Sequence, residues 1–130
     1  MNKNIIPYGR QSVDNKDVEN VVSVLKSDFL TSGPIVKRFE KEICKYSKSR
    51  FAVSANSATS ALHIACLALG LGKDDILWTT PITFVASANC ALYCGAKVDF
   101  VDIDTETFNL SVSSLEKKLI SSKKIGKLPK

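Results

Sequence analysis

The chain has 130 residues, of which 45% are hydrophobic and 24% are charged. This balance is typical of one folded domain and excludes a disordered or collagen-like chain. The formal net charge is +5, but six lysines lie in residues 117–130, a stretch without an acidic residue, so the rest of the chain is close to neutral. We interpret the excess charge as a solvated basic tail, and we expect no nucleic-acid partner.

The cysteines do not predict a metal site or a redox pair. Cys44, Cys66, Cys90 and Cys94 form no CxxC pair, and the chain has a single histidine. We expect free thiols in a reducing compartment. The richest apolar run, residues 61–71, is interrupted by His63 and is far short of the roughly 18 apolar residues that span a bilayer. The sequence therefore predicts a cytoplasmic protein without a metal or a membrane partner.

Hydrophobic periodicity predicts two helices at the start of the chain. Behind the candidate N-cap Asp14, apolar residues recur at helical spacing over residues 15–27: Val18, Val21, Val22 and Leu25. Residues 31–34 break this pattern, and the proline at the end of that break opens a second helix, which ends near Ser47.

Strands and helices alternate after residue 50. The predicted strands are residues 51–54, 76–79 and 97–101, and the predicted helices are residues 60–69, a helix from Thr83 to a stop at Gly95, and a last helix through Ile120 whose capping box is Ser113-x-x-Glu116. This alternation predicts an α/β fold with a mostly parallel sheet and crossover helices. The helix over residues 60–69 is apolar on every side, so we expect it to be buried in a structure larger than three strands provide.

Two loops at the carboxyl ends of predicted strands carry candidate ligand-binding residues. Residues 56–59, Asn-Ser-Ala-Thr, precede a helix, where backbone N–H groups and the Thr59 hydroxyl could bind a phosphate. An ordinary helix cap would use the same residue types, and neither a P-loop nor a dinucleotide fingerprint is present. Phe84 lies in the next such loop, where it could stack on a flat cofactor or pack into the core.

Several further polar residues have plainer interpretations. Asp102 and Asp104 follow the third predicted strand and are more typical of turns than of catalytic carboxylates. His63 lies on the apolar helix and is expected to be a core residue. Residues 121–124 imitate a Ser-x-x-Lys site, but they follow the last predicted helix in the basic tail.

Six short segments form an ordered set over nearly the whole chain: residues 29–34, 39–40, 56–62, 80–89, 95–96 and 101–104. Together they resemble the start of the DegT/DnrJ/EryC1/StrS family of pyridoxal-phosphate-dependent nucleotide-sugar aminotransferases. Within the family, residues 6–9 and 56–62 resemble the branch that acts on the way to pseudaminic acid.

The resemblance implies part of the large domain of a fold-type I, aspartate-aminotransferase-like enzyme that uses pyridoxal 5'-phosphate (PLP). It assigns Ala58 and Thr59 to the cofactor phosphate and Phe84 to the pyridine ring. It places Tyr8 and Thr31 in segments that line the sugar-nucleotide site. The family's Schiff-base lysine is expected beyond residue 130, so the chain alone is expected to be inactive and no catalytic residue is predicted within it.

The implied reaction transfers an amino group from glutamate to C4 of a UDP-linked 4-keto-6-deoxy sugar, in a homodimer. Residues 1–50 would form an N-terminal helical segment and residues 51–130 the start of the α/β sheet, while the remainder of the large domain and the C-terminal domain would lie outside this chain. The alternative is a catalytically inactive, truncated relative that serves as a phosphate-binding, cofactor-binding or interaction module.

Overall fold

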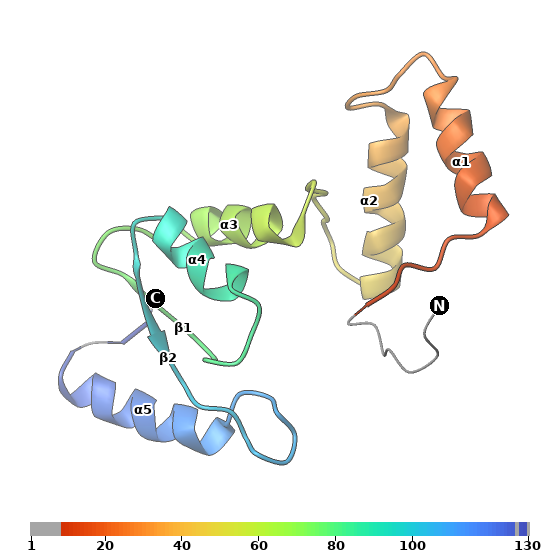
Figure 1. The fold of residues 1–130 in the computed structure, drawn as a ribbon. Helices are drawn as coiled ribbons and strands as arrows, with labels where there is room; N and C mark the ends of the chain where they lie inside the picture. Colours follow the sequence, from red (N-terminus) through yellow and green to blue (C-terminus); the bar gives the residue numbers. More distant parts are fainter. Residues whose placement is uncertain (1–8, 127, 130) are drawn as a thin grey trace. The chain divides into compact units, whose positions relative to one another are not determined.

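The computed structural model describes residues 9–126, 128 and 129. The chain divides into two compact units, Met1–Ser54 and Ala55–Lys130. The helices and strands of both units are labelled in Figure 1.

Two helices make up the described part of the first unit. α1 (Asn15–Leu25) begins with a capping box, in which Asp14 accepts a hydrogen bond from the Asp17 backbone N–H at 2.9 Å and Asp17 accepts one from the Asp14 N–H at 3.0 Å. α2 (Pro34–Ser47) begins with its proline in the first turn, where the missing N–H costs no helical hydrogen bond. Both predicted helices are confirmed.

The segment after α2 bonds back to that helix. The Glu40 carboxylate accepts hydrogen bonds from the backbone N–H of Ser54 at 2.9 Å and from its hydroxyl at 3.0 Å. Residues 51–54, predicted as a strand, are not a strand. Within the described chain no segment pairs with them, and a strand is stabilised by a ladder of hydrogen bonds to a neighbour.

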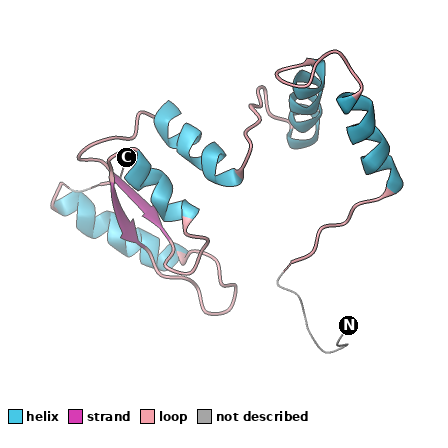
Figure 2. Cartoon of the chain, turned by 45° about the horizontal axis from the view of Figure 1, so that its top comes forward, coloured by secondary structure: helices cyan, strands magenta, loops and turns pink. Residues whose placement is uncertain are grey.

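The second unit has α/β architecture. Its elements are α3 (Ala58–Ala68), β1 (Ile76–Thr79), α4 (Ala86–Tyr93), β2 (Lys97–Phe100) and α5 (Val112–Lys124). The two strands run parallel, with Leu77 opposite Val98 and Trp78 opposite Asp99, and α4 connects them (Figure 2). The α/β class and the parallel sheet with a crossover helix are confirmed, but the described sheet has two strands and not three.

The side chains of the strands alternate between two faces. Leu77 and Val98 pack against the core, which consists of buried residues of α3, α4 and the adjoining turns: Cys66, Leu71, Cys90, Ala91 and Ala96. Trp78 and Asp99 point to the opposite face, where Lys118 of α5 contacts both of them. α3 and α4 therefore lie on one side of the sheet and α5 on the other.

The same alternation decides which backbone groups face the outer edge of β2. The N–H groups of Lys97 and Val101 donate across the sheet to the carbonyls of Asp75 and Thr79, each at 2.9 Å. The N–H and C=O of Phe100 must then face away from β1. There the N–H donates to Asp99 Oδ1 at 2.8 Å and the C=O accepts from Lys118 Nζ at 2.6 Å, so this part of the edge is closed to another strand.

Three helix starts differ from the prediction. α3 begins at Ala58, two residues before the predicted start at residue 60. α4 begins at Ala86 and not at Thr83, because residues 81–85 form a turn that has no side-chain cap. α5 is capped by Ser111, whose hydroxyl accepts from the Ser114 N–H at 3.3 Å, so the predicted capping box at Ser113 is wrong. α5 also continues past its predicted end at Ile120 to Lys124, so Lys123 and Lys124, which were expected in a flexible basic tail, are helical.

α3 is not the buried helix that its composition predicts. Cys66 is its only buried residue, while three large apolar side chains are exposed: Leu62, Ile64 and Leu67. The apolar surface that should pack against further structure is therefore open in this chain. Among the described residues no helix is long and apolar enough to cross a membrane.

Candidate functional site

The N-terminus of α3 presents two backbone N–H groups without an acceptor. Ser57 is the N-cap; its hydroxyl accepts from the Ser60 N–H at 3.1 Å, and its carbonyl accepts from the Ala61 N–H at 3.0 Å. The hydrogen bonds of the described chain leave the N–H groups of Ala58 and Thr59 free, as expected for the first turn of a helix. These are the two residues that the sequence analysis assigned to the cofactor phosphate.

Side chains around this turn leave room for an anion. Ala58 is small and exposed, and the half-buried Thr59 hydroxyl has no hydrogen-bond partner among the described residues. The first turn carries no acidic residue, so no carboxylate competes for the positive end of the helix dipole. Two free N–H groups and a hydroxyl donor fit a phosphate monoester such as that of PLP.

Phe84 lies in the loop between β1 and α4. Its carbonyl accepts from the Ser87 N–H at 2.9 Å, and its side chain is 68% exposed, so it is not a core residue. In Figures 1 and 2 this loop and the N-terminal end of α3 lie at the same end of the second unit. None of the ring contacts among the described residues involves Phe84, so the exposed ring is available to a ligand.

The predicted sugar-nucleotide residues do not belong to this unit. Thr31 is exposed in the loop between α1 and α2, in the unit Met1–Ser54. Tyr8 lies outside the described residues. Both assignments remain predictions.

Asp104 forms a turn, as predicted. Its Oδ1 accepts hydrogen bonds from the N–H of Thr107 at 2.9 Å, the hydroxyl of Thr107 at 3.0 Å and the N–H of Glu106 at 3.1 Å. These bonds, the one from the Thr107 backbone first, lower the pKa of Asp104 below its usual value. The Asp102 carboxylate accepts from the N–H of the next residue at 2.8 Å, and its backbone carbonyl accepts from the Ser111 N–H at 2.9 Å. Such carboxylates stabilise local backbone.

His63 and the cysteines show no catalytic arrangement. His63 is half-buried, with its ring 5.3 Å from that of Tyr93. All four cysteines are free, and burial raises the pKa of the Cys66 thiol to about 11, with a smaller contribution from Cys90 and Cys94. A thiol with so high a pKa is a poor nucleophile. The described residues contain no group of three or more side chains that could hold a metal ion.

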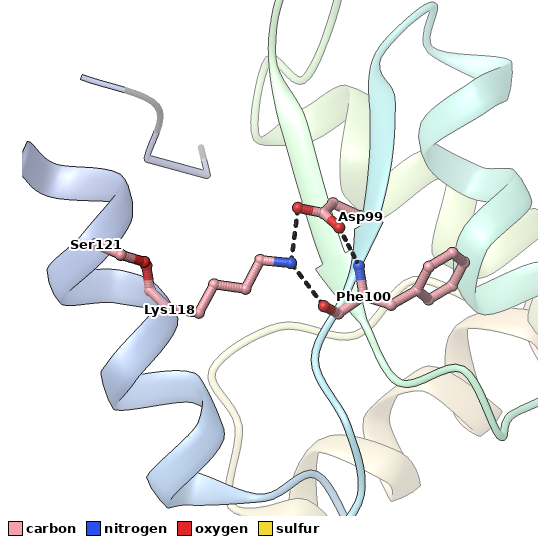
Figure 3. A network of polar contacts seen from close by, with 4 residues as sticks. All are labelled: Asp99, Phe100, Lys118 and Ser121. Carbon is pink, nitrogen blue, oxygen red and sulfur yellow. Dashed lines mark hydrogen bonds and ion pairs between the residues drawn. The ribbon is translucent and has the colours of Figure 1, made fainter. Parts of the chain in front are cut away.

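The sequence analysis missed one polar network, which is centred on Lys118 (Figure 3). Its Nζ lies 2.6 Å from Asp99 Oδ2, 2.6 Å from the Phe100 carbonyl and 4.9 Å from the centroid of the Trp78 ring. The hydrogen bond from Lys118 is the main cause that lowers the pKa of Asp99. The sequence contained one indication that Lys118 turns inward. It lies three residues after Leu115 and four before Ser122, so the three side chains share one face of α5, and all three are at least partly buried.

Comparisons with known proteins agree with this geometry. Residues 11–125 match the DegT/DnrJ/EryC1/StrS aminotransferase family. A UDP-4-amino-4,6-dideoxy-N-acetyl-β-L-altrosamine transaminase of Campylobacter jejuni is 43% identical over 118 residues, which are 91% of this chain and 31% of that enzyme.

Solved structures show the same similarity. The PLP form of Spr1654 from Streptococcus pneumoniae superposes with a TM-score of 0.80 and 30% identity, over 86% of this chain and 29% of that one. An aminotransferase from Psychrobacter cryohalolentis gives a TM-score of 0.78 and 30% identity, over 85% of this chain and 29% of that one. The chain spans less than a third of the length of these relatives. It belongs to the DegT/DnrJ/EryC1/StrS family of PLP-dependent sugar aminotransferases.

Proposed function

We propose that residues 51–130 form the cofactor-binding start of a PLP-dependent nucleotide-sugar aminotransferase. In this proposal Ala58 and Thr59 bind the phosphate and Phe84 stacks on the pyridine ring. The observation that carries it is the first turn of α3, where two N–H groups and the Thr59 hydroxyl have no partner among the described residues, in a member of a PLP-dependent family. When bound, the cofactor supplies the electron sink that amino transfer requires.

The residues of this chain bind and orient that group. A phosphate held by the α3 N-terminus is fixed by short charge-assisted hydrogen bonds and by the helix dipole. A ring stacked on Phe84 would be held at a second point, so its orientation would be defined as well as its position. The lysine that carries the cofactor covalently in the family is expected beyond residue 130.

The reaction that we propose for the whole enzyme transfers the amino group of glutamate to C4 of a UDP-linked 4-keto-6-deoxy sugar, in a pathway of the pseudaminic-acid type. Support comes from the similarity to the altrosamine transaminase of Campylobacter jejuni. Tyr8 and Thr31 would contribute to the sugar-nucleotide site, residues 1–50 would form an N-terminal helical segment, and the enzyme would be a cytoplasmic homodimer.

The test is the affinity of the 130-residue chain for pyridoxamine 5'-phosphate, which carries the same phosphate and ring but no aldehyde that lysines could capture. Thr59→Val removes the hydroxyl donor and keeps the shape. Because a hydrogen bond to a charged group contributes about 1.5–3 kcal/mol, we expect the Kd to rise about tenfold or more. The matched control is Thr105→Val, an exposed threonine in the loop after β2.

The Kd for inorganic phosphate should rise in parallel in Thr59→Val, since the lost donor faces the phosphate. Phe84→Ala should weaken pyridoxamine phosphate and leave inorganic phosphate unchanged, whereas Phe108→Ala, which truncates another exposed ring, should change neither. Equal affinities of Thr59→Val and the wild type for both ligands would refute the phosphate assignment.

A further inference from the structure

Lys118 connects α5 to both strands of the sheet at their carboxyl ends. Its ammonium bonds to Asp99 and to the carbonyl of Phe100, the last residue of β2 (Figure 3). It also lies over the ring of Trp78, one residue before the end of β1. Trp78 and Asp99 are register partners across the sheet. The Lys118 ammonium therefore contacts both strands at one pair of register partners.

This contact is more than a surface ion pair. The Lys118 side chain is 24% exposed, whereas the lysine of the helical pair Lys45–Glu42 is 60% exposed. The Asp99 side chain is 52% exposed, so water screens the ion pair itself, and the contact gains over such a pair through the second charge-assisted hydrogen bond, to the Phe100 carbonyl, and through the Trp78 ring. Trp78 Nε1 is buried and has no hydrogen-bond partner among the described residues, so the Lys118 cation is the polar contact that fixes this ring.

The loop that carries Phe84 begins directly after the end of β1 that Lys118 contacts through Trp78. Thr79 is the last residue of β1, and its carbonyl accepts the final hydrogen bond of the ladder, from the Val101 N–H at 2.9 Å. Within the loop itself, the hydroxyl of Thr80 donates to the carbonyl of Ile82 at 3.2 Å, and the exposed Phe84 ring is not held by the core. The Phe84 carbonyl also accepts from the Ser87 N–H at the start of α4, at 2.9 Å, so the position of Phe84 depends on α4 as well as on how firmly the end of β1 is held.

We propose that Lys118 is a positioning residue for cofactor binding: it fixes the carboxyl ends of β1 and β2 and, through them, the loop that presents Phe84 to the cofactor ring. This inference rests on the proposed function of Phe84. The inference divides the site into two parts, since none of the hydrogen bonds, ion pairs and ring contacts of Lys118 in the described part of the chain reaches the phosphate donors on α3. Lys118 should therefore affect binding of the ring and leave binding of the phosphate unchanged.

The experiment measures the Kd of the 130-residue chain for pyridoxamine 5'-phosphate and, separately, for inorganic phosphate. Lys118→Met keeps the length of the side chain and removes the charge, Lys118→Arg keeps the charge, and Lys117→Met removes the charge of an exposed neighbour on α5. The fluorescence of Trp78, the only tryptophan, reports whether the ring environment has changed.

Lys118→Met should raise the Kd for pyridoxamine phosphate about three- to tenfold, the range that an aromatic stacking contact supplies, with no change for phosphate. Lys118→Arg should largely restore the affinity, and Lys117→Met should match the wild type. Because Lys118 acts through Phe84, the double variant Lys118→Met/Phe84→Ala should bind no more weakly than Phe84→Ala alone.

Equal losses for both ligands would assign Lys118 to general stability and overturn the inference, as would additive losses in the double variant or an unchanged Kd in Lys118→Met. If Phe84→Ala itself binds pyridoxamine phosphate like the wild type, the proposed function of Phe84 fails together with the inference. If Phe84→Ala is weakened and Lys118→Met is not, only the inference fails.

Discussion

Glu40 is the residue whose ionisation reports most directly on the first unit. Hydrogen bonds from the Ser54 backbone and then from the Ser54 hydroxyl lower the pKa of Glu40 below its usual value of 4.5. A lowered pKa in the folded state means that the stabilising contribution is complete above pH 4.5 and is lost as the pH falls through the lowered pKa.

We predict that Ser54→Ala raises the pKa of Glu40 while leaving it below 4.5, because the backbone bond is the larger cause and survives the substitution. An NMR titration of the Glu40 carboxyl carbon measures this shift, and Ser12→Ala, at an exposed serine before α1, is the control. A pKa of Glu40 that is identical in Ser54→Ala and the wild type would contradict the hydrogen bond to the hydroxyl.

At the residue scale, contacts between residues close in sequence could be predicted, and contacts between distant residues could not. The cap at Asp14 and the turn at Asp104 depend on partners three residues away, so the sequence pattern was sufficient to identify them. Lys118 bonds to a carbonyl 18 residues earlier, and no pattern of neighbouring residues contains that pairing. Local sequence made Thr59 and Phe84 candidates, the family resemblance gave Ala58, Thr59 and Phe84 their roles toward the cofactor, and these assignments stay proposals.

At the element scale, the connection between α1 and α2 depends on a glycine that has no space for a side chain. Gly33 is buried at the N-cap of α2, and a Cβ added there would lie 2.7 Å from the Cβ of Phe29. Both atoms are fixed to the backbone, so the turn would have to shift.

We predict that Gly33→Ala destabilises the two-helix unit by about 1–3 kcal/mol, the usual cost of overpacking. Amide hydrogen exchange should show faster opening of α1 and α2 with unchanged exchange in β1 and β2. Gly9→Ala is the matched control, because a Cβ at Gly9 has nothing within 4 Å. Equal protection of α1 and α2 in both variants would contradict the close approach.

The elements themselves were predictable to the extent that their signals are local. Helical periodicity located α1 and α2, and the alternation of strand and helix segments after residue 50 located β1 and β2, each close to its observed ends. The predicted strand at residues 51–54 failed because a strand depends on a neighbour that local sequence does not reveal. The start of α5 failed because Ser111 and Ser113 are both acceptable caps and only the three-dimensional turn selects one.

At the scale of the whole molecule, the chain exposes apolar surface that a folded protein normally covers. Leu67 on α3 is 54% exposed in a helix of almost entirely apolar residues. Contiguous exposed apolar surface drives association. The relatives that the chain matches are more than three times as long, which is consistent with further structure that packs on this helix in them.

We predict that the 130-residue chain associates in a concentration-dependent manner and that Leu67→Lys weakens this association without loss of helix content. Sedimentation velocity and circular dichroism measure the two quantities. Thr105→Lys adds the same charge to an exposed loop and serves as the control. Loss of helix in Leu67→Lys would show that Leu67 is needed for folding and would contradict its exposed position.

The most direct test of the central claim is an amide NMR spectrum of the 130-residue chain titrated with pyridoxamine 5'-phosphate. The account predicts that the largest shifts occur at the N–H groups of Ala58 and Thr59, to lower field as they donate to the phosphate, together with upfield shifts of ligand ring protons over Phe84. If the largest shifts instead occur among the lysines of α5, with Ala58 and Thr59 unchanged, the chain binds the ligand by charge alone and α3 does not hold the cofactor.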